Sequence, residues 1–288
     1  MRMRTFPVFA LVLAFAAFAQ QAPPSGGDKL PSILARMKSE DLHTKIVAFN
    51  ELMTHVASEA GGPKEGSELT GRSDALNKFF SRHPEQADQV KLGLIQLLTK
   101  ENYYFIEGKN PPPDDHAEDD VSEHYAELIN TVSSLNDDRA IPALAGAVTT
   151  GGMAQRGLLK YGDKALDPLL KQLRSPDGLV RASALGMAIT VLEGHNDPEA
   201  HNRVRELLQA LLADPESVVR RKAVWEIDCL DDRQDFVPIL EKIAKTDPEK
   251  RSGKADDGGD GDAFYPVRYD ARRVLHHIQN NKPCGSEY

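Results

Sequence analysis

The chain has 288 residues, with 35 lysines and arginines against 44 aspartates and glutamates, which leaves a formal net charge of −9. An acidic chain without a basic block lacks the clustered cations that nucleic-acid phosphates and anionic membrane surfaces require, so we expect no nucleic-acid partner. Aromatic residues make up only 6% of the sequence, which favours an alanine- and leucine-rich helical protein over a β-sandwich.

The first segment carries the three parts of a secretory signal peptide. Arg2 and Arg4 give it a charged start, an apolar run follows over residues 6–18, and an A-x-A site ends at Ala19. We therefore expect residues 1–19 to be removed and the protein to be exported from a bacterial-type cell, to the periplasm or the extracellular space. The run is shorter than the about 20 apolar residues that span a bilayer. No later segment is apolar enough to do so, and we expect no membrane span after cleavage.

The next part of the chain is predicted to be helical without a regular repeat. Residues 20–30 are rich in proline, glycine and serine and are interpreted as a linker. Residues 31–136 are interpreted as irregular helical N-terminal repeats. Helical apolar spacing covers 33–56, 84–98 and 121–135, and the polar segments 61–71 and 108–120 are predicted to be loops.

Residues 137–280 contain a repeated helical unit. A V-R-x-x-A motif begins at Val180, Val219 and Val267. The first two are about 40 residues apart, which is the length of a helical-pair repeat. A leucine-rich helix precedes each motif, with proline and an acidic residue in the turn between the two helices. One such pair cannot bury its apolar face alone but a stack can, so the pattern predicts an all-α solenoid of helix-turn-helix repeats.

Each motif helix carries an apolar stripe. Apolar residues recur at offsets 0, 4, 8 and 11 from the motif valine, and these offsets fall on one side of a helix at about 100° per residue. We expect these residues to form one buried column: Val180, Ala184, Ala188 and Val191; Val219, Ala223, Ile227 and Leu230; Val267, Ala271, Leu275 and Ile278.

These motifs resemble those of the HEAT-repeat family. The resemblance rests on the P-x-L openings at Pro142, Pro168 and Pro238, on the acidic turns and on the V-R-x-x-A helices. It covers about 137–278 and is weak before that. The resemblance implies that turn acids and motif arginines form a structural ladder between neighbouring repeats. The ladder members that it implies are Asp177 with Arg181, Glu216 with Arg220, and Arg268.

The last repeat contains an acidic insertion at 250–262, which we expect to be flexible because it has almost no apolar side chain. Asp256, Asp260 and Asp262 are weak calcium candidates, since they lie near ligand positions of an EF-hand-like loop. The loop departs from that pattern at its last position, where Val267 replaces the bidentate glutamate. We predict no metal site and no cofactor, and a calcium-dependent structural protein remains an alternative.

The chain has two cysteines, Cys229 and Cys284, the second in a tail at 281–288. In an exported protein two thiols can pair, but the sequence does not show whether their geometry permits a bond. A disulfide and two free thiols therefore both remain open.

Catalytic and metal motifs are absent. The sequence has no G-x-S-x-G, phosphate-binding loop, H-E-x-x-H or C-x-x-C pattern. His116, Asp120, Glu123 and His124 are close in sequence, but no second ligand pair accompanies them, and acids at a helix start have a simpler explanation in the helix dipole. The sequence thus favours a protein that is not an enzyme, with an enzyme on an α-solenoid frame as the alternative.

The predicted binding surface lies opposite the buried column, at offsets 2, 6 and 9 of the motif helices. Trp225 is the only tryptophan, and the equivalent positions hold Gly186 and Arg273. A position that accepts these three residues is not a core position, although Trp225 folded onto a neighbouring repeat or onto the acidic insertion is an alternative. Tryptophan, tyrosine and arginine are enriched in binding hot spots. The predicted binding residues are Ile189, Arg221, Trp225, Tyr269, Arg273 and His276.

The sequence therefore predicts an exported, non-catalytic scaffold that binds a protein or peptide on the concave face of its repeats.

Overall fold

A computed structural model describes residues 29–61, 68–107, 115–150, 152–192, 198–251 and 264–285. Over these ranges the chain is helical and contains no strand, apart from one isolated bridge between Arg251 and Phe264. The all-α solenoid prediction is therefore confirmed. The predicted signal peptide and the calcium candidates Asp256, Asp260 and Asp262 lie outside the described residues, as does His116's side chain.

The N-terminal part consists of long helices. They are α1 (Lys29–Arg36), α2 (Leu42–Glu59), α3 (Glu68–Arg82), α4 (Pro84–Glu107) and α5 (Asp115–Ser133). Asp41 caps α2, because its carboxylate accepts the Thr44 backbone N–H at 2.8 Å. Three boundaries differ from the prediction: α1 begins within the expected linker 20–30, α3 begins within the expected loop 61–71, and α5 begins within the expected loop 108–120. The acidic residues that begin α5 suit a helix N-terminus, which explains why a polar stretch is helical there.

The repeats follow as shorter helices. They are α6 (Ile141–Gly146), α7 (Gly152–Leu159), α8 (Leu166–Gln172), α9 (Gly178–Leu192), α10 (Pro198–Leu211), α11 (Ser217–Ile227), α12 (Val237–Thr246) and α13 (Pro266–Gln279). One-turn 3₁₀ segments lead into α6, α8 and α12. The motif helices predicted from the sequence are α9, α11 and α13.

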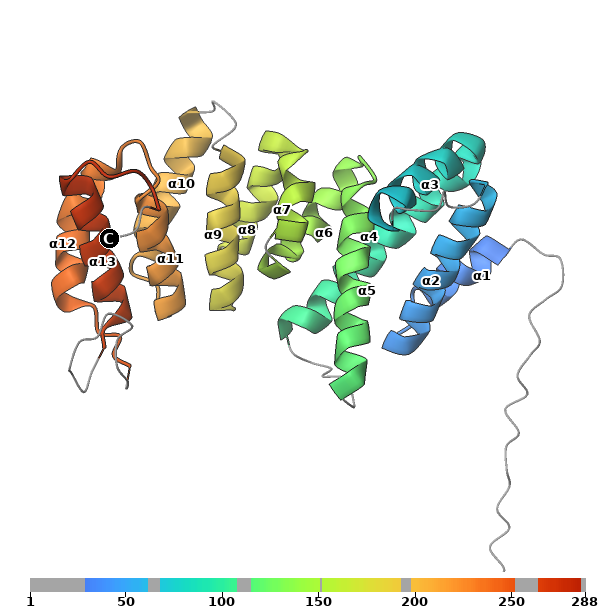
Figure 1. Ribbon diagram of the computed structural model, residues 1–288, viewed down its shortest axis with the longest axis horizontal. Helices are drawn as coiled ribbons and strands as arrows, with labels where there is room; N and C mark the ends of the chain where they lie inside the picture. The colour runs from blue at the N-terminus through green and yellow to red at the C-terminus, as the bar shows by residue number, and fades with distance from the viewer. Residues whose placement is uncertain are drawn as a thin grey trace, which may run out of the picture.

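The helices stack in chain order along an elongated molecule, from α1 at one end to α13 at the other (Figure 1). α8 packs on α9, α10 on α11, and α12 on α13. The motif helices also pack on each other, α9 on α11 and α11 on α13, and stand side by side. We call these three helices the second-helix layer. No helix in the described ranges combines the length and the hydropathy that are needed to cross a bilayer.

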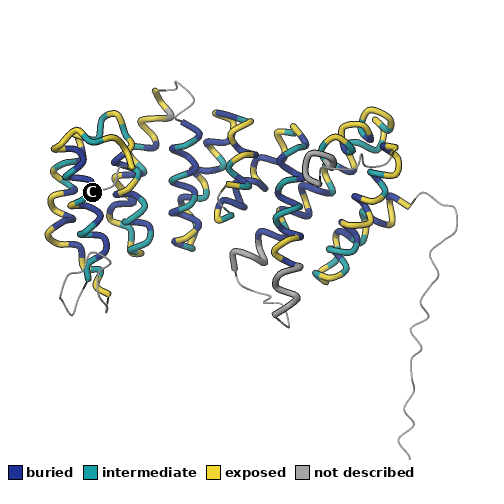
Figure 2. Tube along the Cα trace, viewed as in Figure 1, coloured by how far each residue is buried: buried dark blue, intermediate teal, exposed yellow. Residues whose placement is uncertain are grey.

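The predicted column forms the core of the second-helix layer. Eleven of its twelve residues are buried, and the exception is Leu230, which is partly buried. Leu230 differs because α11 ends at Ile227, so this residue no longer follows the helical period. Figure 2 shows the buried residues running through the helices from one end of the solenoid to the other.

Candidate functional site

The motif arginines join neighbouring repeats. Arg181 binds Asp214 of the next repeat with two parallel bonds, from Nε at 2.8 Å and from Nη2 at 2.7 Å. Arg220 binds Asp247 in the same way, at 2.7 and 3.1 Å. The Nη1 of each arginine donates to two backbone carbonyls in its own turn. Each guanidinium therefore fixes the turn of one repeat against the turn of the next.

The acids of this ladder differ from those that the family resemblance implied. Asp177 caps its own helix, since its carboxylate accepts the Leu179 N–H at 2.7 Å. Glu216 lies 3.2 Å from Arg181 of the preceding repeat, whereas the expected partner was Arg220. Both bidentate acids, Asp214 and Asp247, directly precede the turn proline, whereas the resemblance implied the acid that follows the proline. Arg268, in the last motif helix, donates from Nε to the Asp247 carbonyl at 2.6 Å.

Trp225 lies at the surface of the second-helix layer. Its residue is 40% exposed, and the Arg273 guanidinium lies over its ring at 4.4 Å from the centroid. Leu179, on the neighbouring motif helix, is 60% exposed. Both side chains line a shallow groove of ≈ 370 Å³ between α9 and α11. We call it the Trp225 groove, and its main lining residues are Leu179, Val218, Arg221, Lys222, Trp225 and Arg251.

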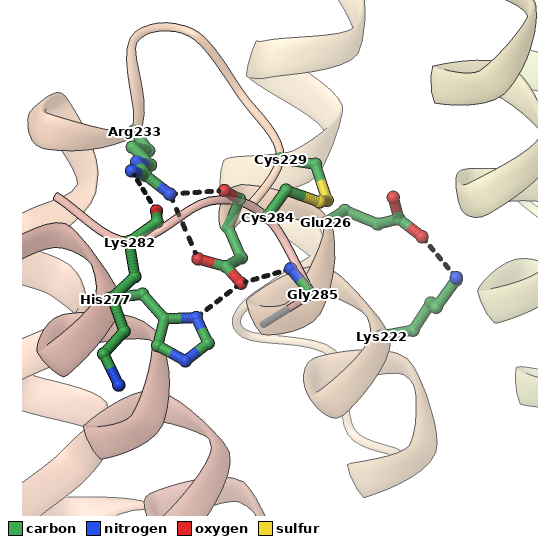
Figure 3. Close-up of a disulfide and its surroundings, with 9 residues drawn as sticks. Lys222, Glu226, Cys229, Arg233, His277, Lys282, Cys284 and Gly285 are labelled. Atoms are coloured by element: carbon green, nitrogen blue, oxygen red, sulfur yellow. Dashed lines mark hydrogen bonds and ion pairs between the residues drawn. A yellow bond between two sulfur atoms is a disulfide. The ribbon is translucent and has the colours of Figure 1, made fainter. Parts of the chain in front are cut away.

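A glycine lets the two motif helices approach beside this groove. A Cβ on Gly186 would lie 2.6 Å from Lys222 Cε and 2.9 Å from Glu226 Oε1. The Lys222–Glu226 ion pair of α11, seen in Figure 3, therefore occupies the space that a side chain at 186 would take. Position 186 corresponds to Trp225 in the next motif helix. It holds glycine because the side chains of the neighbouring repeat leave no room for a larger residue.

The other predicted binding residues lie partly outside the groove. Arg221 lines it and binds Asp270 of α13 through Nε at 2.6 Å. Tyr269 is half-buried, with its ring centroid 5.9 Å from that of Phe264. His276 is half-buried and lies within hydrogen-bond distance of Asn280. Tyr269 and His276 lie on α13 and do not line the groove.

The prediction that Ile189 belongs to the binding surface is wrong. It is only 5% exposed and belongs to the core, so it is not displayed on the predicted surface. The reason is that α9 packs against α7, α8, α10 and α11, which cover most of its circumference. Ile189 instead lines a separate hollow of ≈ 500 Å³ beside Leu192 and Cys229.

A disulfide joins Cys229 to Cys284 and holds the C-terminal tail against the end of α11 (Figure 3). The Asp228 carboxylate accepts the Gly285 N–H at 3.2 Å and lies 2.8 Å from His277 Nδ1. Arg233 adds a bond to the Lys282 carbonyl at 2.7 Å. His277 is fully buried.

Sequence reasoning also missed a buried charged cluster in the N-terminal part. Lys45 Nζ lies 3.1 Å from Glu101 Oε1, and His124 Nε2 lies 4.0 Å from the same oxygen. All three side chains are almost fully buried between α2, α4 and α5. Burial, with the charge of Lys45, lowers the pKa of His124 to about 4, and burial raises the pKa of Glu101. Their positions in sequence, far apart on three helices, give no signal of this meeting.

No group of histidine, cysteine, aspartate and glutamate within the described residues has an arrangement that could hold a metal ion.

A match to a known family covers the helical pairs of the repeats. Residues 166–253, which span α8 to α12, match the model of the HEAT repeats family. This part of the chain thus consists of HEAT-like repeats, as the motifs predicted. No curated protein matches the chain.

Several solved structures of engineered repeat proteins resemble the chain weakly. A designed armadillo repeat protein in complex with the peptide (KR)4 is 18% identical, with a TM-score of 0.35 over 86% of this chain and 99% of that chain. An engineered structural-genomics protein is 19% identical, with a TM-score of 0.34 over 90% of this chain and 100% of that chain. Similarities this weak do not bear on what the chain binds.

Proposed function

We propose that this HEAT-repeat protein is an exported, non-catalytic scaffold that binds a protein or peptide on its second-helix layer. The observation that carries the proposal is the Trp225 groove, where neighbouring repeats expose two large apolar side chains, Leu179 and Trp225, around one hollow. Exposed apolar residues that gather at one place, with tryptophan and arginine among them, are typical of interaction sites.

The ladder supports this role because it makes the surface rigid. The Arg181–Asp214 and Arg220–Asp247 pairs fix the spacing of the repeats on either side of the groove. A surface whose geometry is set before binding loses less conformational entropy when the partner arrives. Solenoids commonly bind along the concave surface that their stacked repeats create, and we place the partner there.

Export is part of the proposal and has separate support. The Cys229–Cys284 disulfide suits an oxidising compartment, since disulfides rarely persist in the cytosol. The signal-peptide pattern at 1–19 agrees with that location. The intact mass of the protein from its native host is expected to correspond to a chain that begins at Gln20. A mass that retains residues 1–19 would contradict export by cleavage.

Binding is tested with a peptide-display selection against the mature, oxidised protein. We expect Trp225→Ala to weaken the selected ligands about 30-fold, which corresponds to the loss of one hot-spot residue. Leu92→Ala is the matched control, because Leu92 is also exposed but lies on α4. Circular dichroism verifies that both variants fold. Ligands that lose affinity with Leu92→Ala and not with Trp225→Ala would place the binding surface elsewhere.

A further inference from the structure

The charged side chains that line the described part of the Trp225 groove are cations, although the protein is acidic. The chain carries a formal net charge of −9. Three cations, Arg221, Lys222 and Arg251, nevertheless line the groove, and the described residues that line it include no carboxylate. Arg273 lies directly beyond the Trp225 ring. A local charge of this sign attracts anions and disfavours cationic ligands.

Each of these three lining cations has an acidic partner in the protein and can still bind a ligand. Arg221 is held by its Nε on buried Asp270, and an arginine has four further N–H donors. Lys222 pairs with Glu226 one turn along the same helix, and the Arg251 side chain is 54% exposed, 3.6 Å from Glu249. The Lys222 and Arg251 side chains remain 40% and 54% exposed in these pairs, so a ligand carboxylate can approach each cation beside the protein's own acid.

The apolar part of the groove sets the size of what binds. Leu179, Val218 and Trp225 surround a volume of ≈ 370 Å³. This lies near the lower limit for small-ligand pockets, so it accommodates a single large side chain of a peptide. The apolar anchor and the cations belong to one hollow, and the ligand must satisfy both.

We infer that the Trp225 groove binds an acidic peptide segment in which one large apolar side chain is flanked by carboxylates. This inference rests on the proposed function and specifies the chemistry of its partner. The apolar side chain lies between Leu179 and Trp225, and the flanking carboxylates bind Arg221, Lys222 and Arg251.

Because Trp225 is the only tryptophan, its fluorescence reports on the groove directly. The probes are three capped pentapeptides with a central leucine, flanked on each side by two aspartates, two asparagines or two lysines. With the mature protein, the aspartate peptide is expected to change Trp225 emission saturably and to bind about 10-fold more tightly than the asparagine peptide. Its affinity is expected to fall several-fold between about 50 mM and about 500 mM salt. The lysine peptide is expected not to bind.

Substitutions locate the charge that is responsible. Lys222→Ala combined with Arg251→Ala is expected to reduce affinity for the aspartate peptide about 10-fold and to leave binding of the asparagine peptide unchanged. Arg203→Ala is the matched control, since Arg203 is an exposed cation of α10 that pairs with Asp167 outside the groove. Equal losses from the double variant and from Arg203→Ala would overturn the inference, because only the net charge would then matter.

Failure of this inference is distinguishable from failure of the proposed function. If display selects neutral or basic ligands that depend on Trp225, the scaffold function stands and the acidic preference is wrong. If no ligand depends on Trp225 and no peptide changes its emission, both are wrong. A variant with Asp256, Asp260 and Asp262 changed to asparagine tests whether these acids of the chain itself compete with the peptide for the groove. If this variant binds the aspartate peptide and the wild type does not, the groove's ligand is the chain's own acidic segment and the inference of an external partner is wrong.

Discussion

His124 lies in the buried cluster with Lys45 and Glu101, and its environment makes its protonation costly. Its pKa in the folded protein is about 4, because burial and the charge of Lys45 disfavour the imidazolium form. In the unfolded chain an ordinary histidine has a pKa of about 6.5. Between these two pH values the unfolded state binds a proton that the folded state does not, so the free energy of unfolding falls as the pH falls.

We predict that His124 costs the protein about 3 kcal/mol of stability between pH 7 and pH 4, at about 1.4 kcal/mol per pKa unit. His124→Gln is expected to remove this dependence, measured by urea unfolding across that pH range. The raised pKa of Glu101 acts in the opposite direction, and comparing variant with wild type isolates the histidine. His276→Gln is the control on a half-buried histidine. Parallel pH profiles for wild type and His124→Gln, or an NMR titration of His124 near pH 6.5, would contradict the prediction.

At the scale of the elements, the arginine ladder connects helices that are far apart in the sequence. Arg220 belongs to α11, whereas Asp247 directly follows α12 and its side chain is only 3% exposed. Removing the arginine leaves a carboxylate that is buried without its cation, and such an uncompensated charge is far more costly than a lost surface contact.

We therefore predict that Arg220→Ala lowers the free energy of unfolding by about 3–5 kcal/mol. Arg203→Ala, which breaks the exposed pair with Asp167, is expected to cost at most about 1 kcal/mol. Urea denaturation of the two variants provides the measurement. Similar losses would mean that the Arg220–Asp247 pair behaves as an ordinary surface ion pair.

At the scale of the whole molecule, each repeat contacts its neighbours, so stability is distributed locally along the solenoid. The Cys229–Cys284 disulfide links positions separated by 55 residues and encloses α12 and α13. Because it restricts the unfolded chain over that segment, it contributes about 2–4 kcal/mol to the stability of the C-terminal end.

Reduction is accordingly predicted to accelerate amide hydrogen exchange in α12 and α13 and to leave α2 and α4 unchanged. Exchange is measured by mass spectrometry with and without a thiol reductant. A Cys229→Ser, Cys284→Ser double variant under oxidising conditions should reproduce the reduced pattern. A uniform rise in exchange along the chain would show that the repeats unfold as one cooperative unit instead.

The sequence by itself determined the architecture of the repeats. The V-R-x-x-A motifs and their apolar offsets predicted the helices that became α9, α11 and α13, together with all but one member of their buried column. This succeeded because the helical period is a local property, and a stripe that recurs in several helices has to be covered by the same kind of neighbour. Export and the partner-binding face remain predictions.

Only the tertiary structure decided which distant residues meet. It paired Arg181 and Arg220 with the acids that precede the next turn's proline, joined Cys229 to Cys284, and brought Lys45, Glu101 and His124 together. It also buried Ile189, although its offset placed it opposite the column. The periodicity of one helix determines the direction of a side chain around its axis, whereas burial depends on how many other helices surround it. That number is set by the stacking of the repeats.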